Sequence, residues 1–546
     1  MSRFSLHSRW MALSVTLLVG VGVFLFWFLG YPHALSYQEQ YQLFLWTGDY
    51  FWEDVRQVGG LADWLGEFFV QFYYVEWLGA AVLALLFVAF LGLTTKVMGN
   101  IWYALLPTAL LHVHMGDESV LLSYVVALLL ALSVSLAMRK THYLFDLLVV
   151  PVLYLLIGPV AWLYVFLRLI QQKKWRAVGF LLYLLAIQLV VSNTLLHQWP
   201  FQSTMYGTNY YRIPLKVPPA QVLIPVFILL FAAWGNPFSR LGVEKWRVAT
   251  LFTIAGMALF FGFDKEKYEL IRQDYLIRHE RWQEVVSRAE KYQVPVSFSS
   301  ECVNLSLAMT GQLAQRQFSF YQSGEDALVM PMVRDLTSNL PTMEAFYRLG
   351  MVNESMRYAF DLQESILNGK KSGRLTKRIA ECCIINGKYA VAEKYLDLLQ
   401  QSLFYRDWAK EAKTYLGNEA WIDAHPQWGK LRKLRYQQDF LYNYGEIDKM
   451  FGNLFINNPA NKMALEYFLA QLLLKGDVAA FQQYLGWAQQ YGGYPSMPHT
   501  YEDAMRCIQA HGQLSGSPYA AYAQRMTAPV LSVATESQQT QPTSAH

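Results

Sequence analysis

Long apolar stretches fill the first half of the chain and are absent from the second. Between Met11 and Phe263 the sequence consists of apolar runs separated by short polar segments, and from Asp264 onward charges of both signs return. An apolar run of about 20 residues is long enough to cross the hydrocarbon core of a bilayer as a helix. The pattern predicts an all-α protein with a polytopic transmembrane domain, residues 1–263, followed by a water-exposed domain, residues 264–514.

Nine apolar runs are candidate spans. They are residues 11–30, 77–94, 101–113, 120–138, 143–157, 159–170, 177–191, 220–234 and 248–263. Several are shorter than a full span, so we expect their ends to extend into flanking aromatic residues or the runs to be partly re-entrant. No small-residue cleavage site follows the first run, which therefore predicts an uncleaved anchor. The runs that flank Gly158-Pro159 form either one broken helix or two short ones.

Basic residues predict the orientation. Lys and Arg cluster in alternate loops, at Arg3/Arg9, Lys96, Arg139-Lys140, Lys173–Arg176 and Arg240–Arg247, whereas loops 31–76, 115–119 and 192–219 are acidic or polar. Basic loops stay in the cytoplasm, which places the N-terminus there. The loops at Arg139 and Lys173 then lie on the same side, which favours two helices between them and nine spans in all. Because nine is odd, the second half lies outside, in the periplasm of a bacterium whose inner membrane holds the protein.

The second half has a helical pattern with repeated hairpin signatures. Residues 387–396 combine a glycine turn, an aromatic residue and small residues at helical spacing; residues 476–485 are a looser copy, and Trp282 begins a third. This pattern resembles the second helix of a tetratricopeptide-like hairpin. It predicts an α-solenoid of degenerate hairpins, whose concave face would dock a protein partner. Residues 515–546 are rich in Ser, Thr, Gln and Pro, which predicts a disordered tail.

Composition excludes several classes of protein. With 54% hydrophobic and 16% charged residues, the chain is too apolar for a soluble enzyme, and a net charge of +4 without a basic block excludes a nucleic-acid partner. The four cysteines, Cys302, Cys382, Cys383 and Cys507, lack CxxC spacing, so we expect buried thiols rather than a zinc site. A disulfide at Cys302 or Cys507 stays open in an oxidising compartment.

The first outer loop, residues 31–76, has an amphipathic pattern. Leu61, Leu65, Phe68, Phe69 and Phe72 recur at helical spacing, whereas Asp63 and Glu67 fall on another face. A helix of this kind lies in the membrane interface. Nearby aromatic residues are typical of an interfacial belt: Trp46, Trp52, Trp64, Tyr73, Tyr74 and Trp77.

Acids stand in the first two outer loops. Glu39 lies among amides and phenols just after the first span, and Asp117 and Glu118 follow His112 and His114 in the next outer turn. This arrangement resembles the C-type glycosyltransferases, which take a sugar from a polyprenyl-linked donor. The resemblance implies that Glu39 is a catalytic base and that Asp117 and Glu118 bind a divalent cation. The chain has no DxD or WWDYG-like motif, and it carries Glu where that family more often has Asp.

Two other functions compete with this one. If the acids are ordinary solvated groups and the two histidines pack in the interface, the protein is a non-enzymatic membrane scaffold whose solenoid docks envelope proteins. A transporter ranks lowest, since only Asp146 and Arg168 approach the spans.

Four segments also resemble a family of multi-pass proteins from Bacteroidetes with a helical-repeat tail and no assigned activity. They are Leu35-Ser-Tyr-Gln-Glu-Gln-Tyr-Gln-Leu-Phe44, Asn304-Leu-Ser-Leu-Ala-Met-Thr-Gly-Gln-Leu313, Asn386-Gly-Lys-Tyr-Ala-Val-Ala-Glu-Lys-Tyr395 and Asn458-Pro-Ala-Asn-Lys-Met-Ala-Leu-Glu-Tyr467. This resemblance supports the two-part architecture and implies no activity.

Overall fold

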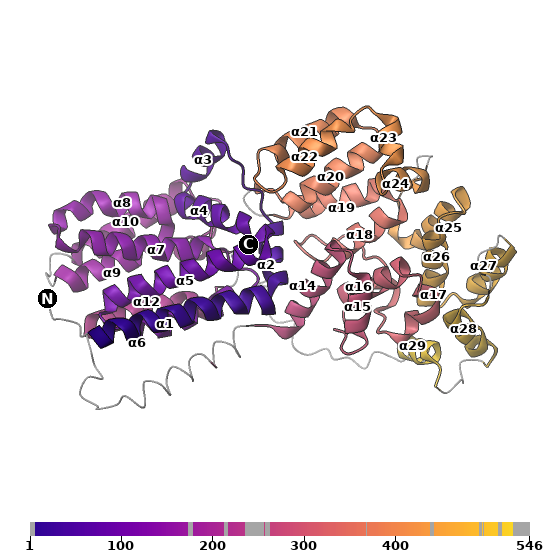
Figure 1. The fold of residues 1–546 in the computed structure, drawn as a ribbon, viewed down its shortest axis with the longest axis horizontal. Coiled ribbons are helices and arrows are strands. Elements are labelled where there is room, and N and C mark those ends of the chain that lie inside the picture. The colour runs from indigo at the N-terminus through magenta and orange to yellow at the C-terminus, as the bar shows by residue number, and fades with distance from the viewer. Residues whose placement is uncertain are drawn as a thin grey trace, which may run out of the picture. The chain divides into compact units, whose positions relative to one another are not determined.

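The computed structural model describes residues 6–172, 178–211, 217–234, 256, 263–366, 369–436, 442–490, 494, 496–510 and 516–527. These residues form helices and no strand, apart from one isolated bridge between Val120 and Tyr211. The chain divides into two compact units: the first contains Met1–Tyr275 and Ala359–Trp428, and the second contains Leu276–Tyr358 and Gly429–His546. Figure 1 labels their helices. The expected all-α class is confirmed. The compact units do not coincide with the predicted change of solvent at residue 263, which stays a prediction; part of the charged half packs in the first unit.

Eight of the nine apolar runs form helices within the described residues. They are α1 (Leu6–Leu25, continued by the π-helical turn Phe26–Gly30), α5 (Glu76–Met98), α6 (Ile101–Met115), α7 (Ser123–Ala137), α8 (Asp146–Ile157), α9 (Ala161–Gln172), α10 (Gly179–Thr194) and α12 (Pro219–Trp234). Most of the ninth run, 248–263, lies outside the described residues. Among the described residues, four helical stretches are long and apolar enough, by length and composition alone, to cross a membrane: Trp10–Gly30, Glu76–Met98, Ser123–Lys140 and Tyr143–Gln172. The count of nine spans therefore stays a prediction.

These helices form a bundle that is apolar both inside and outside. Leu83, Phe87 and Leu128 are buried in its core, whereas large aliphatic residues on the outer face are exposed: Leu13, Leu17, Leu18, Leu85, Leu148 and Leu182. A helix that is apolar all round is typical of a membrane span.

Helices α8 and α9 form a hairpin. The Arg168 guanidinium lies 3.0 Å from the Asp146 carboxylate, and the Tyr164 hydroxyl donates to the same carboxylate. In one straight helix, 22 residues would separate Asp146 from Arg168 by about 33 Å. The chain instead reverses at Gly158, whose φ of +63° is a conformation that favours glycine. The two-helix interpretation of this segment is the one that the structure shows.

The bundle has two chemically different ends. At one end, Gln172 and Arg168 donate to the Thr141 carbonyl, so the segment after Arg139-Lys140 meets the helix that precedes Lys173. At the other end, the three segments expected outside meet. Asn209 donates to the Val58 carbonyl (3.2 Å), and the Leu121 amide donates to the Tyr210 carbonyl (2.9 Å).

Helix α14 (Lys265–Arg278) begins the charged half at that second end. Its Lys267 ammonium lies 2.5 Å from the Glu118 carboxylate, and its Tyr268 hydroxyl donates to the Gly116 carbonyl at 2.9 Å. Thus α14 begins beside the acidic turn at residues 115–119.

The first unit also contains the helices of the first outer loop and a set of later helices. In the loop they are α2 (Pro32–Gln40), α3 (Gly48–Val55), α4 (Gly60–Val70) and the 3-10 turn η2 (Gln71–Tyr74); later come α20 (Gly373–Ile385), α21 (Tyr389–Gln400), α22 (Arg406–Thr414) and α23 (Glu419–Ala424). Helix α19 (Val352–Glu364) and helix α24 (Trp428–Leu434) cross the division between the units. The signature at residues 387–396 corresponds to a real hairpin: Gly387 (φ +71°) separates α20 from α21, and Ala392 is fully buried.

The second unit is built of short helices. They are α15 (Trp282–Ala289), α16 (Ser297–Met309), α17 (Leu313–Arg316), α18 (Leu340–Leu349), α25 (Ile447–Asn457), α26 (Lys462–Lys475), α27 (Val478–Gln490), α28 (His499–Gln509) and α29 (Pro518–Thr527). Both remaining signatures begin helices, at Trp282 and Val478. The stacking of all the hairpins into one solenoid stays a prediction.

The sequence also made predictions about the C-terminal segment and the four cysteines. Helix α29 lies in the segment that we expected to be disordered; it is ordered because the rings of Tyr519 and Tyr522 pack at 5.1 and 4.9 Å from that of Phe318. Residues 528–546 lie outside the described residues. Cys302, Cys382, Cys383 and Cys507 are all buried.

Candidate functional site

Glu39 lies at the end of α2, where it is buried with only 3% of its surface exposed. The Tyr405 hydroxyl, from the turn before α22, donates to Glu39 Oε1 at 2.7 Å. The next residue, Gln40, accepts from Arg374 Nη1 at 2.6 Å, and its backbone carbonyl accepts from the Ser372 hydroxyl. The predicted catalytic base therefore contacts a helical hairpin that lies more than 300 positions later in the sequence.

A second group of acids from the same loop surrounds Lys370. The Lys370 ammonium lies 2.6 Å from Asp54, 3.0 Å from Glu67 and 3.6 Å from Asp63. The Tyr50 hydroxyl donates to Glu67, and its ring centre is 5.4 Å from the ammonium. We call Asp54, Asp63, Glu67 and Lys370 the Lys370 cluster; its three acids are all buried.

The Lys370 cluster holds more negative than positive charge. Burial raises the pKa of Asp54 and of Asp63 above the ordinary value of 3.8, although the Lys370 ammonium acts in the opposite direction. Burial alone would lower the pKa of Lys370, but the surrounding carboxylates outweigh it and raise the pKa. Lys370 therefore stays charged, and removing it would leave three buried acids without a counter-charge.

Two consecutive glycines bring these acids together. Thr47 caps α3 by accepting from the Tyr50 amide at 3.3 Å, and Asp54 follows near the end of that helix. Gly59 then takes a φ of +80°, and a Cβ on Gly60 would lie 1.8 Å from the Asp54 carbonyl oxygen. Only glycine permits so close a turn. This turn starts α4 against α3. It thereby places Asp63 and Glu67 of α4 beside Asp54 of α3.

Further polar contacts fix the same helices. Arg374 Nη1 lies 2.7 Å from Asp274 on α14, and two backbone bonds join the loop to the hairpin: the Gly373 amide donates to the Gln42 carbonyl (3.2 Å), and the Trp46 amide donates to the Gln401 carbonyl (2.9 Å). We call this set of contacts, together with Glu39–Tyr405 and the Lys370 cluster, the docking interface. It joins the first outer loop to α20–α22.

The acids predicted to bind a cation have protein partners. Asp117 Oδ1 accepts from the amide and the hydroxyl of Ser119, at 2.9 and 2.6 Å. Glu118 pairs with Lys267. His112 packs among aromatic rings, with those of Phe26 and Trp27 at 4.6 and 6.0 Å. Within the part of the chain that the structure describes, no three His, Cys, Asp or Glu residues are grouped as metal ligands.

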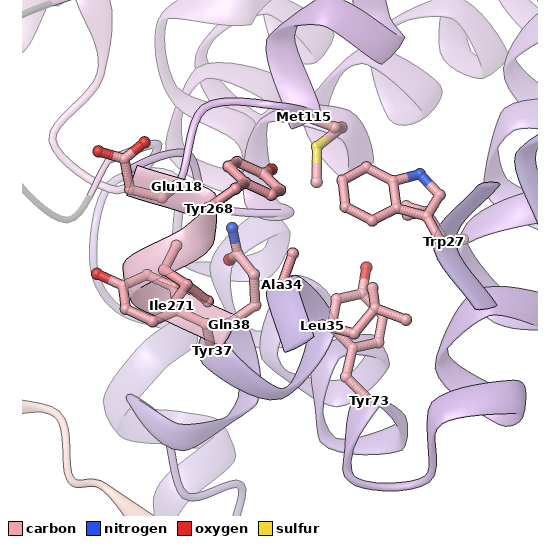
Figure 2. Close-up of a pocket in the computed structure, with 11 residues that line it drawn as sticks. Trp27, Ala34, Leu35, Tyr37, Gln38, Tyr73, Met115, Glu118, Tyr268 and Ile271 are labelled. Carbon is pink, nitrogen blue, oxygen red and sulfur yellow. The ribbon is translucent and has the colours of Figure 1, made fainter. Parts of the chain in front are cut away.

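A small pocket adjoins Glu118 (Figure 2). Tyr37 and Gln38 of α2 line it together with Tyr268, Met115 and Trp27. Glu39, the next residue of α2, contacts Tyr405 instead. The cavity volume is about 10 Å³, which is room for about one water molecule. Gln38, from loop 31–76, and Glu118, from loop 115–119, therefore line the same pocket.

Sequence reasoning missed Lys370, Arg374 and Tyr405. The signal that could have found two of them is charge: residues 370–378 hold Lys370, Lys371, Arg374, Lys377 and Arg378, opposite in sign to the acid-rich loop 31–76. Nothing in the sequence pattern distinguishes Tyr405 from the other tyrosines of the helical half.

Comparison with known proteins gives a family and no activity. A family model described as a family of unknown function (DUF6057) matches residues 7–528. No curated protein matches the chain. No solved structure matches it either.

Proposed function

Since the chain belongs to the DUF6057 family over nearly its whole length, and that family brings no activity with it, we propose a function from the geometry: the protein is an integral membrane scaffold. The apolar bundle anchors it, and the docking interface holds α20–α22 against the first outer loop. The observation that carries this proposal is the use of buried loop acids, Glu39 and those of the Lys370 cluster, to bind a distant part of the same chain.

The proposal includes a location. The exposed leucines of the bundle support embedding in lipid, because an apolar outer face of this size is costly in water. We place the bundle in a bacterial inner membrane with nine spans, the basic segments and the N-terminus in the cytoplasm, and the helical half in the periplasm. The α8–α9 hairpin supports this topology, since a hairpin returns the chain to the side from which it started.

Fusions of a reporter that is active only in the periplasm test the topology. A fusion after Phe263 should be active and one after Arg139 inactive. The opposite result would invert the proposed orientation.

The scaffold function explains the burial of the loop acids better than a glycosyltransferase activity does. A base must reach its substrate, whereas Glu39 is buried against Tyr405. A polyprenyl-linked sugar is also far larger than the pocket beside Glu118. The glycosyltransferase activity stays a prediction. Our scaffold proposal includes envelope proteins as the partners that the helical hairpins would bind.

A pair of variants separates the two functions. If Glu39 serves docking, Glu39→Leu, which removes the acceptor, and Tyr405→Phe, which removes the donor, should each speed hydrogen exchange in residues 401–405. The double variant should add little, because both changes remove the same hydrogen bond. Complementation of a deletion strain should fall in parallel. If Glu39 is a base, Glu39→Gln abolishes complementation with exchange unchanged, and Tyr405→Phe is active. That second pattern would overturn the scaffold.

A further inference from the structure

We infer that the turn between α21 and α22, residues 401–405, lies in the membrane interface beside α4, so that the helical half touches lipid directly. The inference rests on the proposed embedding of the bundle and goes beyond it. The partner is the boundary between head groups and acyl chains of the leaflet that surrounds the outer end of the bundle.

Helix α4 leaves part of its apolar stripe exposed, although Leu65 and Phe69 also pack against the core of the bundle. Its acids Asp63 and Glu67 are buried, because they face Lys370. The apolar residues of the predicted stripe are only half-buried: Leu61, Leu65, Phe68, Phe69 and, in the following turn, Phe72. At a water-exposed surface the acids of such a helix would be expected to face the solvent; here they are buried and apolar residues are partly exposed, which favours a solvent less polar than water on that side.

A continuous row of aromatic rings joins this side of α4 to the later turn. Ring centres are 5.7 Å apart for Trp46 and Phe68, 5.5 Å for Phe68 and Phe72, and 6.0 Å for Phe72 and Phe404. The Phe404 ring then stacks on Tyr74 at 5.2 Å. Together with Leu403 and Trp77, these residues form what we call the aromatic surface.

The aromatic surface is exposed and meets the start of a candidate span. Trp46, Tyr74, Trp77 and Leu403 are all exposed. Tyr74 and Trp77 flank Glu76, the first residue of α5, whose 23 residues are long enough to cross a bilayer. Trp and Tyr concentrate where acyl chains meet head groups, since each has an apolar ring and a polar tip. Continuity with α5 therefore identifies the lipid leaflet as the occupant of this surface.

The docking interface fixes the turn in this position. The Trp46 amide holds the Gln401 carbonyl at 2.9 Å, and Tyr405 is bonded to Glu39. Between these two anchors, Ser402 is buried and Leu403 is 39% exposed. An apolar side chain held outward between two bonded residues is well placed to insert among lipids.

Depth-dependent quenching tests the inference on the full chain. Leu403→Cys is labelled with the fluorophore NBD, and the protein is reconstituted in phosphatidylethanolamine–phosphatidylglycerol nanodiscs; the native thiols are buried. Lipids with a spin label at the 5-position of the acyl chain should reduce its fluorescence. Gln401→Cys, an exposed polar position of the same turn, provides a second reporter should Leu403→Cys fold poorly.

Two matched positions make the result decisive. Val391→Cys is the negative control, because Val391 is 42% exposed near the far end of α21, a helix of 12 residues or about 18 Å. Leu85→Cys, 67% exposed within α5, is the positive control for embedding. Quenching at residue 403 and not at 391 supports the inference.

Other outcomes overturn it in distinguishable ways. Quenching at residue 85 with equal, low quenching at 403 and 391 removes the inference and leaves the embedded bundle intact. A label at 403 that is unquenched and yet shows blue-shifted emission identifies a protein cover, such as a second copy or an envelope protein, in place of lipid. No quenching at residue 85 would remove the proposed embedding itself.

Discussion

Replacement of Lys370 by methionine is the most demanding test of the docking interface. The change keeps the length of the side chain and removes its charge, so Asp54, Asp63 and Glu67 lose the ammonium that lies 2.6, 3.6 and 3.0 Å away. Removing one partner of a buried ion pair costs about 3–5 kcal/mol, because the remaining charge stays buried and unpaired. The free energy that holds the docking interface closed should fall by that amount.

Hydrogen exchange measures this free energy directly. The amides of Gly373 and Trp46 donate across the docking interface, so they exchange when it opens. Since a tenfold change in an equilibrium corresponds to about 1.4 kcal/mol, exchange at these amides should rise roughly 100- to 4,000-fold. Mass spectrometry of peptides that cover residues 42–46 and 372–376 resolves such a change.

Lys413 offers a matched control. Its ammonium lies 2.7 Å from Asp397 and 3.1 Å from Glu393, and both acids are exposed. Exposed pairs contribute little, so Lys413→Met should leave exchange almost unchanged. Lys370→Met combined with Asp54→Asn should recover part of the protection, because one unpaired charge is removed. Equal exchange in Lys370→Met and wild type would refute the reasoning, as would equal effects at Lys370 and Lys413.

Three further predictions concern the same unit. Because burial raises the pKa of Asp54 and Asp63 above 3.8, their contribution to docking is complete below that pH and is lost as pH rises through the raised values; opening measured by exchange, corrected for the intrinsic rate, should increase as pH rises above 3.8, and Asp54→Asn/Asp63→Asn should flatten the profile. Gly373→Ala places a Cβ 2.4 Å from the Tyr405 ring, so it should displace that ring and expose residues 401–405 to proteolysis, whereas a wild-type digestion pattern would contradict the close approach. Ala392→Trp should lower the melting temperature of the protein in detergent, since overpacking a fully buried position costs about 1–3 kcal/mol, and an unchanged temperature would count against its placement between helices.

Local sequence patterns predicted the helices but could not predict which helices pack together. The apolar runs became helices, and glycine turns began helices at Tyr389 and Val478, because helical periodicity is a property of neighbouring residues. The amphipathic pattern of α4 was also visible. Its polar side, however, suggested solvated acids, and Asp63 and Glu67 are buried. Their burial depends on Lys370, about 300 positions away, and no periodicity connects residues so distant.

The same reasoning explains why the compact units could not be predicted from the sequence. A change in charge density at Asp264 indicates where the solvent changes, and it does not indicate which helices pack together. Residues 359–428 join the first unit because their basic side chains meet the acids of the first loop. Helix α29 lies beyond residue 515, where the sequence predicted disorder, for a related reason. The rings of Tyr519 and Tyr522 pack against that of Phe318, which lies far earlier in the sequence.

The ion pair that closes the α8–α9 hairpin has a consequence for biosynthesis. An unpaired Asp or Arg costs up to about 2.5–3.5 kcal/mol at the centre of a bilayer and less toward its edge. Asp146 emerges from the ribosome 22 residues before Arg168, so α8 carries an unpaired acid until α9 has been made. Release of α8 into lipid at that stage would be unfavourable, and the translocon should retain it until Arg168 arrives. In the proposed topology, residues 143–172 would then enter the bilayer as one event, with its timing set by the synthesis of α9.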